Sequence, residues 1–335
     1  MKFLPTNKKR IAFVYAAAIG LLLLAIIFGV GVGSSFISPV RAIMALVGRG
    51  ETADVGIVRY IRLPRALAGI FCGGALALSG AVIQSVLGNR LASPSIIGVN
   101  SGAGFLVTVG CALGIAGGIS LSLLAFLGAL ISSAVIALGA KKFGSSGGTV
   151  ILMGVALNSL FGALSDTVIT LAPDVSILSN DFRIGGFSAV TYQRLIPAAV
   201  IIIITSAALF LLSPRLEVLT LGEESATGLG LRANLVSAVF LCFSALLAGS
   251  AVSVCGGISF VGLLVPHALR RIMGGRIRHL LPLCFLVGGG FVSLCDTLAR
   301  AVFSPYEIPV GIIMAFFGAP LFIVILIKRK RGRAL

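Results

Sequence analysis

Long apolar runs, repeated from one end of the chain to the other, constrain the fold most. The first extends over residues 11–33 without a charged side chain, and further runs follow it to the last residues. A bilayer core about 30 Å thick is crossed by about 20 apolar residues in a helix. Soluble domains have about 25% charged residues, whereas this 335-residue chain has 11%. The sequence therefore predicts an all-α, multi-pass membrane protein, with residues 1–335 forming a single membrane domain.

Ten membrane-spanning helices are predicted from these runs. They cover residues 11–33, 63–87, 96–117, 119–140, 150–171, 194–213, 234–255, 258–273, 280–302 and 307–327. An even number places the basic ends of the chain, residues 1–10 and 328–335, on the same side of the membrane. Loops rich in Lys and Arg stay in the cytoplasm, so we expect both termini to be cytoplasmic.

The net charge of +16 does not indicate a nucleic-acid partner. The basic residues lie in short blocks beside the apolar runs, where they meet lipid headgroups and water. The six cysteines all lie inside apolar runs and form no CxxC pair, so metal-ligand spacing is absent. We expect this chain to bind membrane lipid, and no cofactor, metal or nucleic acid.

The chain has no means of its own to hydrolyse ATP. It contains no Gly-Lys dipeptide, so a Walker A loop is excluded. Asp166 and Asp296 are the only acidic residues in the interior of predicted spans, and we expect Asp296 to pair with Arg300 four residues later. Asp166 keeps an ion-gradient-driven secondary transporter open as an alternative, because charges within a membrane mark ion pathways. No span combines paired carboxylates, a HExxH motif or a nucleophile with a base, so we predict no enzymatic activity.

A short polar segment, LGEESATGLGLR at residues 221–232, interrupts the apolar pattern within the loop 214–233. Gly222 can break the preceding helix, and Glu223 and Glu224 suit the positively polarised first turn of a new one. Gly228 or Gly230 can end it. The pattern predicts a short helix on the cytoplasmic surface, with an ordinary solvated turn as the alternative.

Two segments echo each other. ALALSGAV (75–82) and ALLAGSAV (245–252) share four of eight residues, and each precedes a stretch that contains proline. In the predicted layout these two helices run in opposite directions, as an inverted repeat requires. The two segments therefore favour an inverted repeat.

Four blocks resemble the FecCD-type permeases, the transmembrane subunits of type II ABC importers for iron-siderophores, haem and vitamin B12. They are RLPRALAGIFCGGALALSGAVIQSVLGNRLASPSIIGVNSGAGF (62–105), GGISFVGLLVPHALRRIMG (256–274), DTLAR (296–300) and IPVGIIMAFFGAPLFIVIL (308–326). Two positions depart from the family pattern. Arg90 stands where the family usually has proline, and the stretch SNDFRIGGFSAVTYQ lacks the usual tryptophan before its glycines.

The resemblance implies a permease in the bacterial cytoplasmic (inner) membrane, with an iron-siderophore complex as cargo and haem or vitamin B12 as alternatives. It implies two ATP-binding subunits that use the ATP, an external substrate-binding protein and a second permease copy. We expect a homodimer, with a heterodimer as the alternative. The loop between the sixth and seventh helices docks on the ATPase in this family, which assigns coupling to Gly222, Glu223, Glu224, Ala226, Gly228 and Gly230.

The resemblance also implies roles at both ends of the transport path. Outer arginines of the family pair with glutamates of the binding protein, which assigns docking to Arg59, Arg62, Arg65 and Arg300. The first three are spaced by three residues, so we expect them to share one helix face. The alternative is that they reach lipid phosphates. Ser145 and Ser146, in the loop after the fourth helix, are expected at a cytoplasmic gate.

Overall fold

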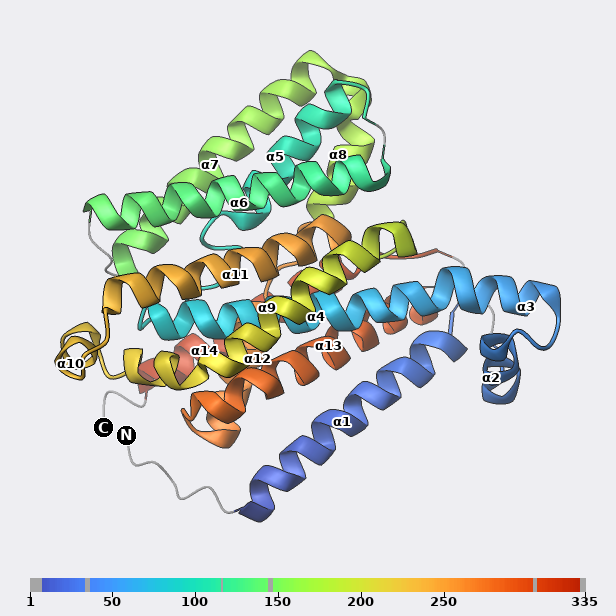
Figure 1. Ribbon diagram of the computed structural model, residues 1–335. Helices are drawn as coiled ribbons and strands as arrows, with labels where there is room; N and C mark the ends of the chain where they lie inside the picture. Colours follow the sequence, from blue (N-terminus) through green and yellow to red (C-terminus); the bar gives the residue numbers. More distant parts are fainter. Residues whose placement is uncertain (1–7, 34–36, 116, 144–146, 304–305, 332–335) are drawn as a thin grey trace.

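The computed structural model describes residues 8–33, 37–115, 117–143, 147–303 and 306–331. Every regular element in these residues is a helix, as the apolar runs predict (Figure 1). The all-α prediction is therefore confirmed. The parts of the basic termini at residues 1–7 and 332–335 lie outside the described residues, as do Ser145 and Ser146 of the expected gate.

Each predicted span corresponds to a helix. These helices are α1 (Lys8–Gly31), α4 (Leu63–Val86), α5 (Val99–Ala112), α6 (Gly118–Phe143), α7 (Gly147–Leu171), α9 (Tyr192–Leu219), α11 (Ala233–Cys255), α12 (Val261–Met273), α13 (Ile277–Val302) and α14 (Val310–Arg331). Shorter helices connect them: α2 (Pro39–Val47), α3 (Thr52–Gly56), η1 (Ile57–Arg62), η2 (Pro173–Val175), α8 (Ser176–Ile184) and α10 (Glu223–Gly228).

Length separates these helices into two kinds. Seven stretches are long and apolar enough to cross a membrane, and they contain α1, α4, α6, α7, α9, α11 and α13. The helices α5 and α12 have 14 and 13 residues, fewer than the roughly 17 residues that a crossing requires. The number of ten crossings therefore stays a prediction.

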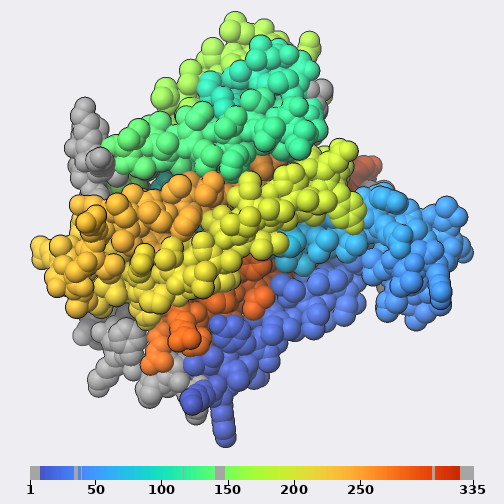
Figure 2. Space-filling model, in the orientation of Figure 1, coloured from blue at the N-terminus to red at the C-terminus, as the bar shows by residue number. Residues whose placement is uncertain are grey.

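The helix α4 lies at the centre of the bundle, and 89% of its membrane-crossing apolar stretch is buried. It packs against α13, α11, α12 and α9, and Figure 2 shows α9 and α11 covering much of one side of it. Small residues allow these close contacts in lipid, where helices associate mainly by close packing. A methyl group added at Gly80 would overlap the backbone of Gly262 on α12, so the two backbones touch at this point.

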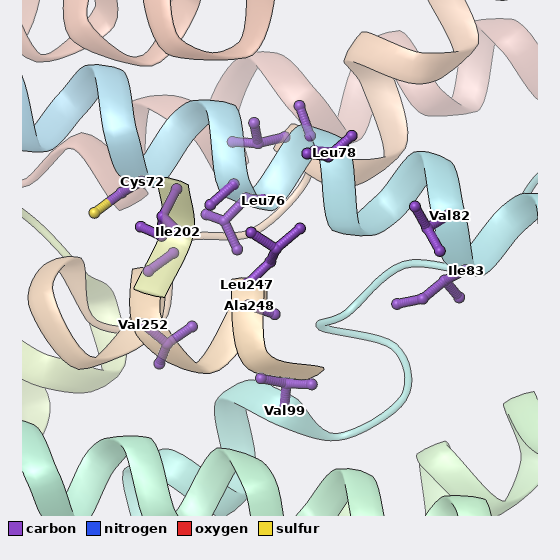
Figure 3. Packing of buried hydrophobic residues seen from close by; sticks show 14 of the residues in the cluster. Cys72, Leu76, Leu78, Val82, Ile83, Val99, Ile202, Leu247, Ala248 and Val252 are labelled. Atoms are coloured by element: carbon purple, nitrogen blue, oxygen red, sulfur yellow. The ribbon is translucent and has the colours of Figure 1, made fainter. Parts of the chain in front are cut away.

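The two echoing segments pack directly against each other. Figure 3 shows Leu76 of α4 beside Leu247 of α11, and the two helices pack along each other. The Ser79 hydroxyl donates a hydrogen bond of 2.8 Å to the Ser244 carbonyl oxygen. A loop and a short helix follow each segment, α5 in one case and α12 in the other. This arrangement is the one expected if α4–α5 and α11–α12 are the corresponding parts of an inverted repeat.

The bundle has two distinct ends. The helix α10 lies at one end, on the left of Figure 1, and α1 starts toward this end. The helices α2 and α3 lie at the opposite end, on the right. The candidate functional residues fall into these two groups, which we call the α10 end and the α2 end.

Candidate functional site

At the α10 end, a six-residue helix stands between the ends of α9 and α11. Gly222, with φ of 103°, precedes the helix, and Gly230, with φ of 84°, follows it. Both angles lie in the region that favours glycine. The Leu231 amide donates to the Ala226 carbonyl oxygen at 3.1 Å, so the chain leaves the helix in a tight turn. The predicted short helix is therefore present, and the alternative of a simple turn is wrong.

The side chains of α10 divide into an anchor and a free face. Ala226 is fully buried against the bundle, whereas Glu223 and Glu224 are exposed. Glu223, Glu224, Thr227 and Gly228 line an open, shallow hollow on the surface. Both carboxylates lie in the first helical turn, where the helix dipole stabilises negative charge. This end thus presents an acidic helix that the bundle holds by one small residue.

At the α2 end, a buried ion cluster joins α4 to α13. The Arg65 guanidinium donates to both carboxylate oxygens of Asp296, at 2.9 and 3.0 Å. It also donates to Glu307, at 2.7 Å, in the segment before α14. Arg300 pairs with Asp296 at 3.3 Å, which confirms the predicted i,i+4 pair. Arg65, Asp296 and Arg300 are all buried, so a two-pronged, charge-assisted contact holds this junction.

Two arginines also bind the last turn of α1. Arg62 donates to the carbonyl oxygens of Val30 and Gly31, at 3.0 and 2.9 Å. Arg300 donates to the Gly29 carbonyl oxygen at 3.3 Å. The last carbonyls of a helix have no partner within it, and cations there complement the helix dipole. These arginines therefore fasten α1 to the bundle.

The expectation that Arg59, Arg62 and Arg65 share one helix face is wrong, because the chain over Ile57–Arg62 is a π-helix. A π-helix forms i→i+5 hydrogen bonds and has a wider turn than an α-helix, so a spacing of three no longer aligns side chains. Arg59 turns to α2 and donates to the Leu46 carbonyl oxygen at 2.7 and 3.1 Å. Arg62 turns to α1, and Arg65 turns to α13.

Asp166 is not a buried ion-binding group. Its side chain is exposed on α7 and pairs with Arg183 of α8 at 3.0 Å. The described residues contain no group of three or more His, Cys, Asp or Glu that could hold a metal ion.

Two charged residues that connect separate helices were not predicted from the sequence. Glu307 reaches Arg65 from 242 residues away, and its only local signal was a carboxylate close to the start of the last apolar run. Arg270 of α12 bonds to α4 through the Ala81 carbonyl oxygen, the Ser85 hydroxyl and the Gln84 side chain. A helical projection of α12 alone gives no sign of these three partners.

The sequence profile of the FecCD transport family matches residues 21–328. The chain belongs to this family. It is therefore a membrane-embedded transport permease of the ABC class and not an enzyme, which confirms the resemblance read from the four blocks.

Permeases for several different cargoes are similar to this chain in sequence. The ferric enterobactin permease of Escherichia coli (FepD) is 34% identical, over 94% of this chain and 96% of its own. The Fe(3+)-citrate permease YfmE of Bacillus subtilis is 32% identical, over 96% of each chain. The cobalamin permease BtuC of Halobacterium salinarum is 37% identical, over 84% of this chain and 76% of its own.

Solved structures agree with the fold of this FecCD permease. A structure described as an inward-facing transporter of the metal-chelate ABC type matches with a TM-score of 0.84 at 30% identity. It covers 95% of this chain and 99% of that one. PsaBC of Streptococcus pneumoniae, at 18% identity and a TM-score of 0.57, supports the fold alone.

Proposed function

We propose that this FecCD permease carries an iron-siderophore complex across the bacterial inner membrane, driven by ATP that two separate ATPase subunits hydrolyse. The observation that carries the proposal is the family match over residues 21–328, in a chain that keeps an acidic helix exposed at one end. Relatives for ferric enterobactin and ferric citrate support iron as cargo. Cobalamin is the second candidate, because the archaeal cobalamin permease is 37% identical. Haem stays a third.

Coupling is assigned to α10. Gly222 and Gly230 delimit the helix, Ala226 anchors it, and Glu223, Glu224 and Gly228 border the open hollow. A soluble ATPase subunit needs a polar, rigid surface to bind. The exposed face of α10 is such a surface, and it lies at the end of the bundle. The assignment predicts that motion of the ATPase reaches the bundle through α9 and α11, which pack against α10.

Docking of an external binding protein is assigned to the α2 end, around Arg59, Arg62, Arg65 and Arg300. Arg62, Arg65 and Arg300 bond within the chain, so the contact is made where this cluster reaches the surface. Glu307 marks that place, since its side chain is 42% exposed while it pairs with Arg65. A carboxylate of the binding protein that replaces Glu307 on Arg65 would keep the cation paired.

The remaining assignments concern assembly and orientation. A second permease copy, identical or related, completes the transport path, and Ser145 and Ser146 form part of its cytoplasmic gate. The α10 end faces the cytoplasm together with both termini, and the α2 end faces outward. The basic residues at the start of α1, Lys8, Lys9 and Arg10, support this orientation.

Uptake by vesicles tests the proposed cargo. The permease is reconstituted with its ATPase inside the vesicles, and the loaded binding protein is added outside. We expect ATP-dependent accumulation of a labelled ferric siderophore that a proton or sodium ionophore does not abolish. Accumulation of cobalamin or haem alone would replace the cargo, and uptake abolished by an ionophore would support the secondary-transport alternative.

A further inference from the structure

The nine-residue helix α2 presents its large apolar side chains away from the protein. Val40, Ile43, Met44 and Val47 are 50–64% exposed. Their spacing of three and four residues places them on one helix face. This face covers the full length of α2 and contains no charged side chain.

The opposite face of α2 holds it against the bundle with small side chains. Ala42 and Ala45 are 5% and 0% exposed, and they pack in a cluster with Val30 of α1, Ile37 and Val58 of η1. A helix on a water-facing surface turns its large apolar residues inward. In α2 the small residues point inward and the large apolar residues point outward. Its outer face is therefore suited to an apolar surrounding.

Both ends of α2 are fixed in place. The Ser38 hydroxyl accepts from the Arg41 amide at the start, and Gly48, with φ of 84°, ends the helix. Arg59 donates twice to the Leu46 carbonyl oxygen, which satisfies a carbonyl near the end of α2. The outer face is therefore a fixed feature of the fold.

The position of α2 matches the boundary between lipid and water. The 24 residues of α1 extend about 36 Å at 1.5 Å per residue, which is enough to cross a hydrocarbon core of about 30 Å. The helix α2 begins eight residues after α1 ends, at the α2 end of the bundle (Figure 1). Arg41 of α2 forms ion pairs with Glu51 and Asp54, at 3.0 and 2.8 Å, so one edge of α2 carries charged groups that favour water.

The exposed face of α2 continues an apolar surface on the adjoining helix. Only 11% of the membrane-crossing apolar stretch of α1 is buried. Near its end, four large side chains are about half exposed: Leu23, Leu24, Ile27 and Phe28. A membrane-crossing helix with such a surface faces acyl chains. Because α2 packs against α1, the same lipid reaches its edge.

A protein partner fits this face less well. Stable protein interfaces bury about 800 Å² and 20–30 residues on each side. A helix of nine residues, about 13 Å long, offers four large side chains. The apolar face of α2 alone is smaller than such an interface, whereas an amphipathic helix needs only one apolar face to lie in the membrane interface.

We infer that α2 lies in the membrane interface opposite the α10 end, with Val40, Ile43, Met44 and Val47 inserted among lipid acyl chains. The inference requires neither a particular cargo nor a particular orientation of the chain. It gives α2 the role of holding the α1–η1 corner at a fixed depth in the bilayer.

Tryptophan fluorescence tests this directly, because the chain contains no tryptophan. Ile43→Trp and Val47→Trp are made separately in the full chain and reconstituted in phosphatidylcholine vesicles. Leu24→Trp on α1 is the lipid-exposed control, and Thr52→Trp, exposed at the start of α3, is the water-exposed control. Two reporters on the same face guard against one variant that fails to insert.

We expect Ile43→Trp and Val47→Trp to emit at shorter wavelength than Thr52→Trp. Brominated phospholipids should quench both as strongly as Leu24→Trp, and aqueous iodide should quench them several-fold less than Thr52→Trp. Quenching by iodide and not by brominated lipid would overturn the inference, because the face would then lie in water. Protection from both quenchers would also overturn it, because a protein surface would then cover α2.

Discussion

Charged residues are buried at one end of this permease and exposed at the other. At the α2 end, Arg62, Arg65 and Arg300 are buried and bond to carboxylates or to the last carbonyls of α1. At the α10 end, Glu223 and Glu224 are exposed on a helix that only Ala226 anchors. Residues that the chain satisfies internally hold the fold together. Residues that it leaves exposed and bounded by glycine are available to a partner.

The comparison predicts that substitutions at the α2 end change stability, whereas substitutions at the α10 end change coupling. Breaking one buried contact should lower the free energy of unfolding by several kcal/mol. Replacing an exposed side chain away from special features should change it by about 0.5 kcal/mol or less. The following experiments run from the largest expected effect on stability to the smallest.

Asp296→Asn should have the largest effect. It removes the charge that pairs with Arg65 and Arg300, and an unpaired buried charge costs about 3–5 kcal/mol. Unfolding in detergent micelles measures the loss. Asp166→Asn is the matched control, because its pair with Arg183 is exposed and should contribute about 1 kcal/mol or less. Equal losses for the two variants would contradict the structural role of the buried cluster.

Arg62→Gln should have an intermediate effect. It removes the donor to Val30 and Gly31 and leaves two carbonyls at the end of α1 without that partner. We expect a loss of about 1–3 kcal/mol, measured by the same unfolding experiment. Arg49→Gln, at an exposed position of the same end, should be nearly neutral. A neutral Arg62→Gln would show that α1 does not depend on this contact.

Glu307→Gln should change stability by about 1 kcal/mol or less, since the pair with Arg65 is partly exposed. Its main effect should be on docking, because it frees one side of the Arg65 guanidinium for a carboxylate of the binding protein. We expect tighter binding with a steeper salt dependence, measured by surface plasmon resonance on permease in nanodiscs.

Glu51→Gln is the control for Glu307→Gln. It removes the same unit charge from the same end but leaves Arg65 untouched, because Glu51 pairs with Arg41. An equal gain from both variants would show a general charge effect and would contradict the exchange at Arg65.

Cysteine labelling should leave stability unchanged and test the orientation that the comparison assumes. In a variant without native cysteines, Ser225→Cys on α10 should be unreactive in intact cells toward an impermeant maleimide. Ser176→Cys, at the start of α8, should react. A reactive Ser225→Cys would reverse the assignment of the two ends.

Much of the fold was predictable because it depends on local pattern. The ten apolar runs all correspond to helices, and the acidic, glycine-bounded segment forms α10 as expected. The pair of Asp296 with Arg300 was predictable because its partners are one turn apart. In each case the physical signal lies within one helix.

The α2 end was less predictable because its structure is non-local. Arg65 and Asp296 are 231 residues apart, so no helical spacing shows their contact. The π-helix over Ile57–Arg62 changes the direction of Arg59 and Arg62, and an argument from 3.6-residue periodicity places them wrongly. The helix α2 was missed because nine residues with prolines and glycines nearby resemble a loop.

The double variant Glu223→Lys with Glu224→Lys tests the central claim most directly. It reverses the exposed face of α10 and leaves the buried Ala226 in place. ATPase stimulation by loaded binding protein is measured in vesicles that contain the complete transporter, and unfolding of the same variant is measured in micelles. We predict that stimulation is lost while the free energy of unfolding changes by about 0.5 kcal/mol or less. Normal stimulation by a well-folded double variant would contradict the account.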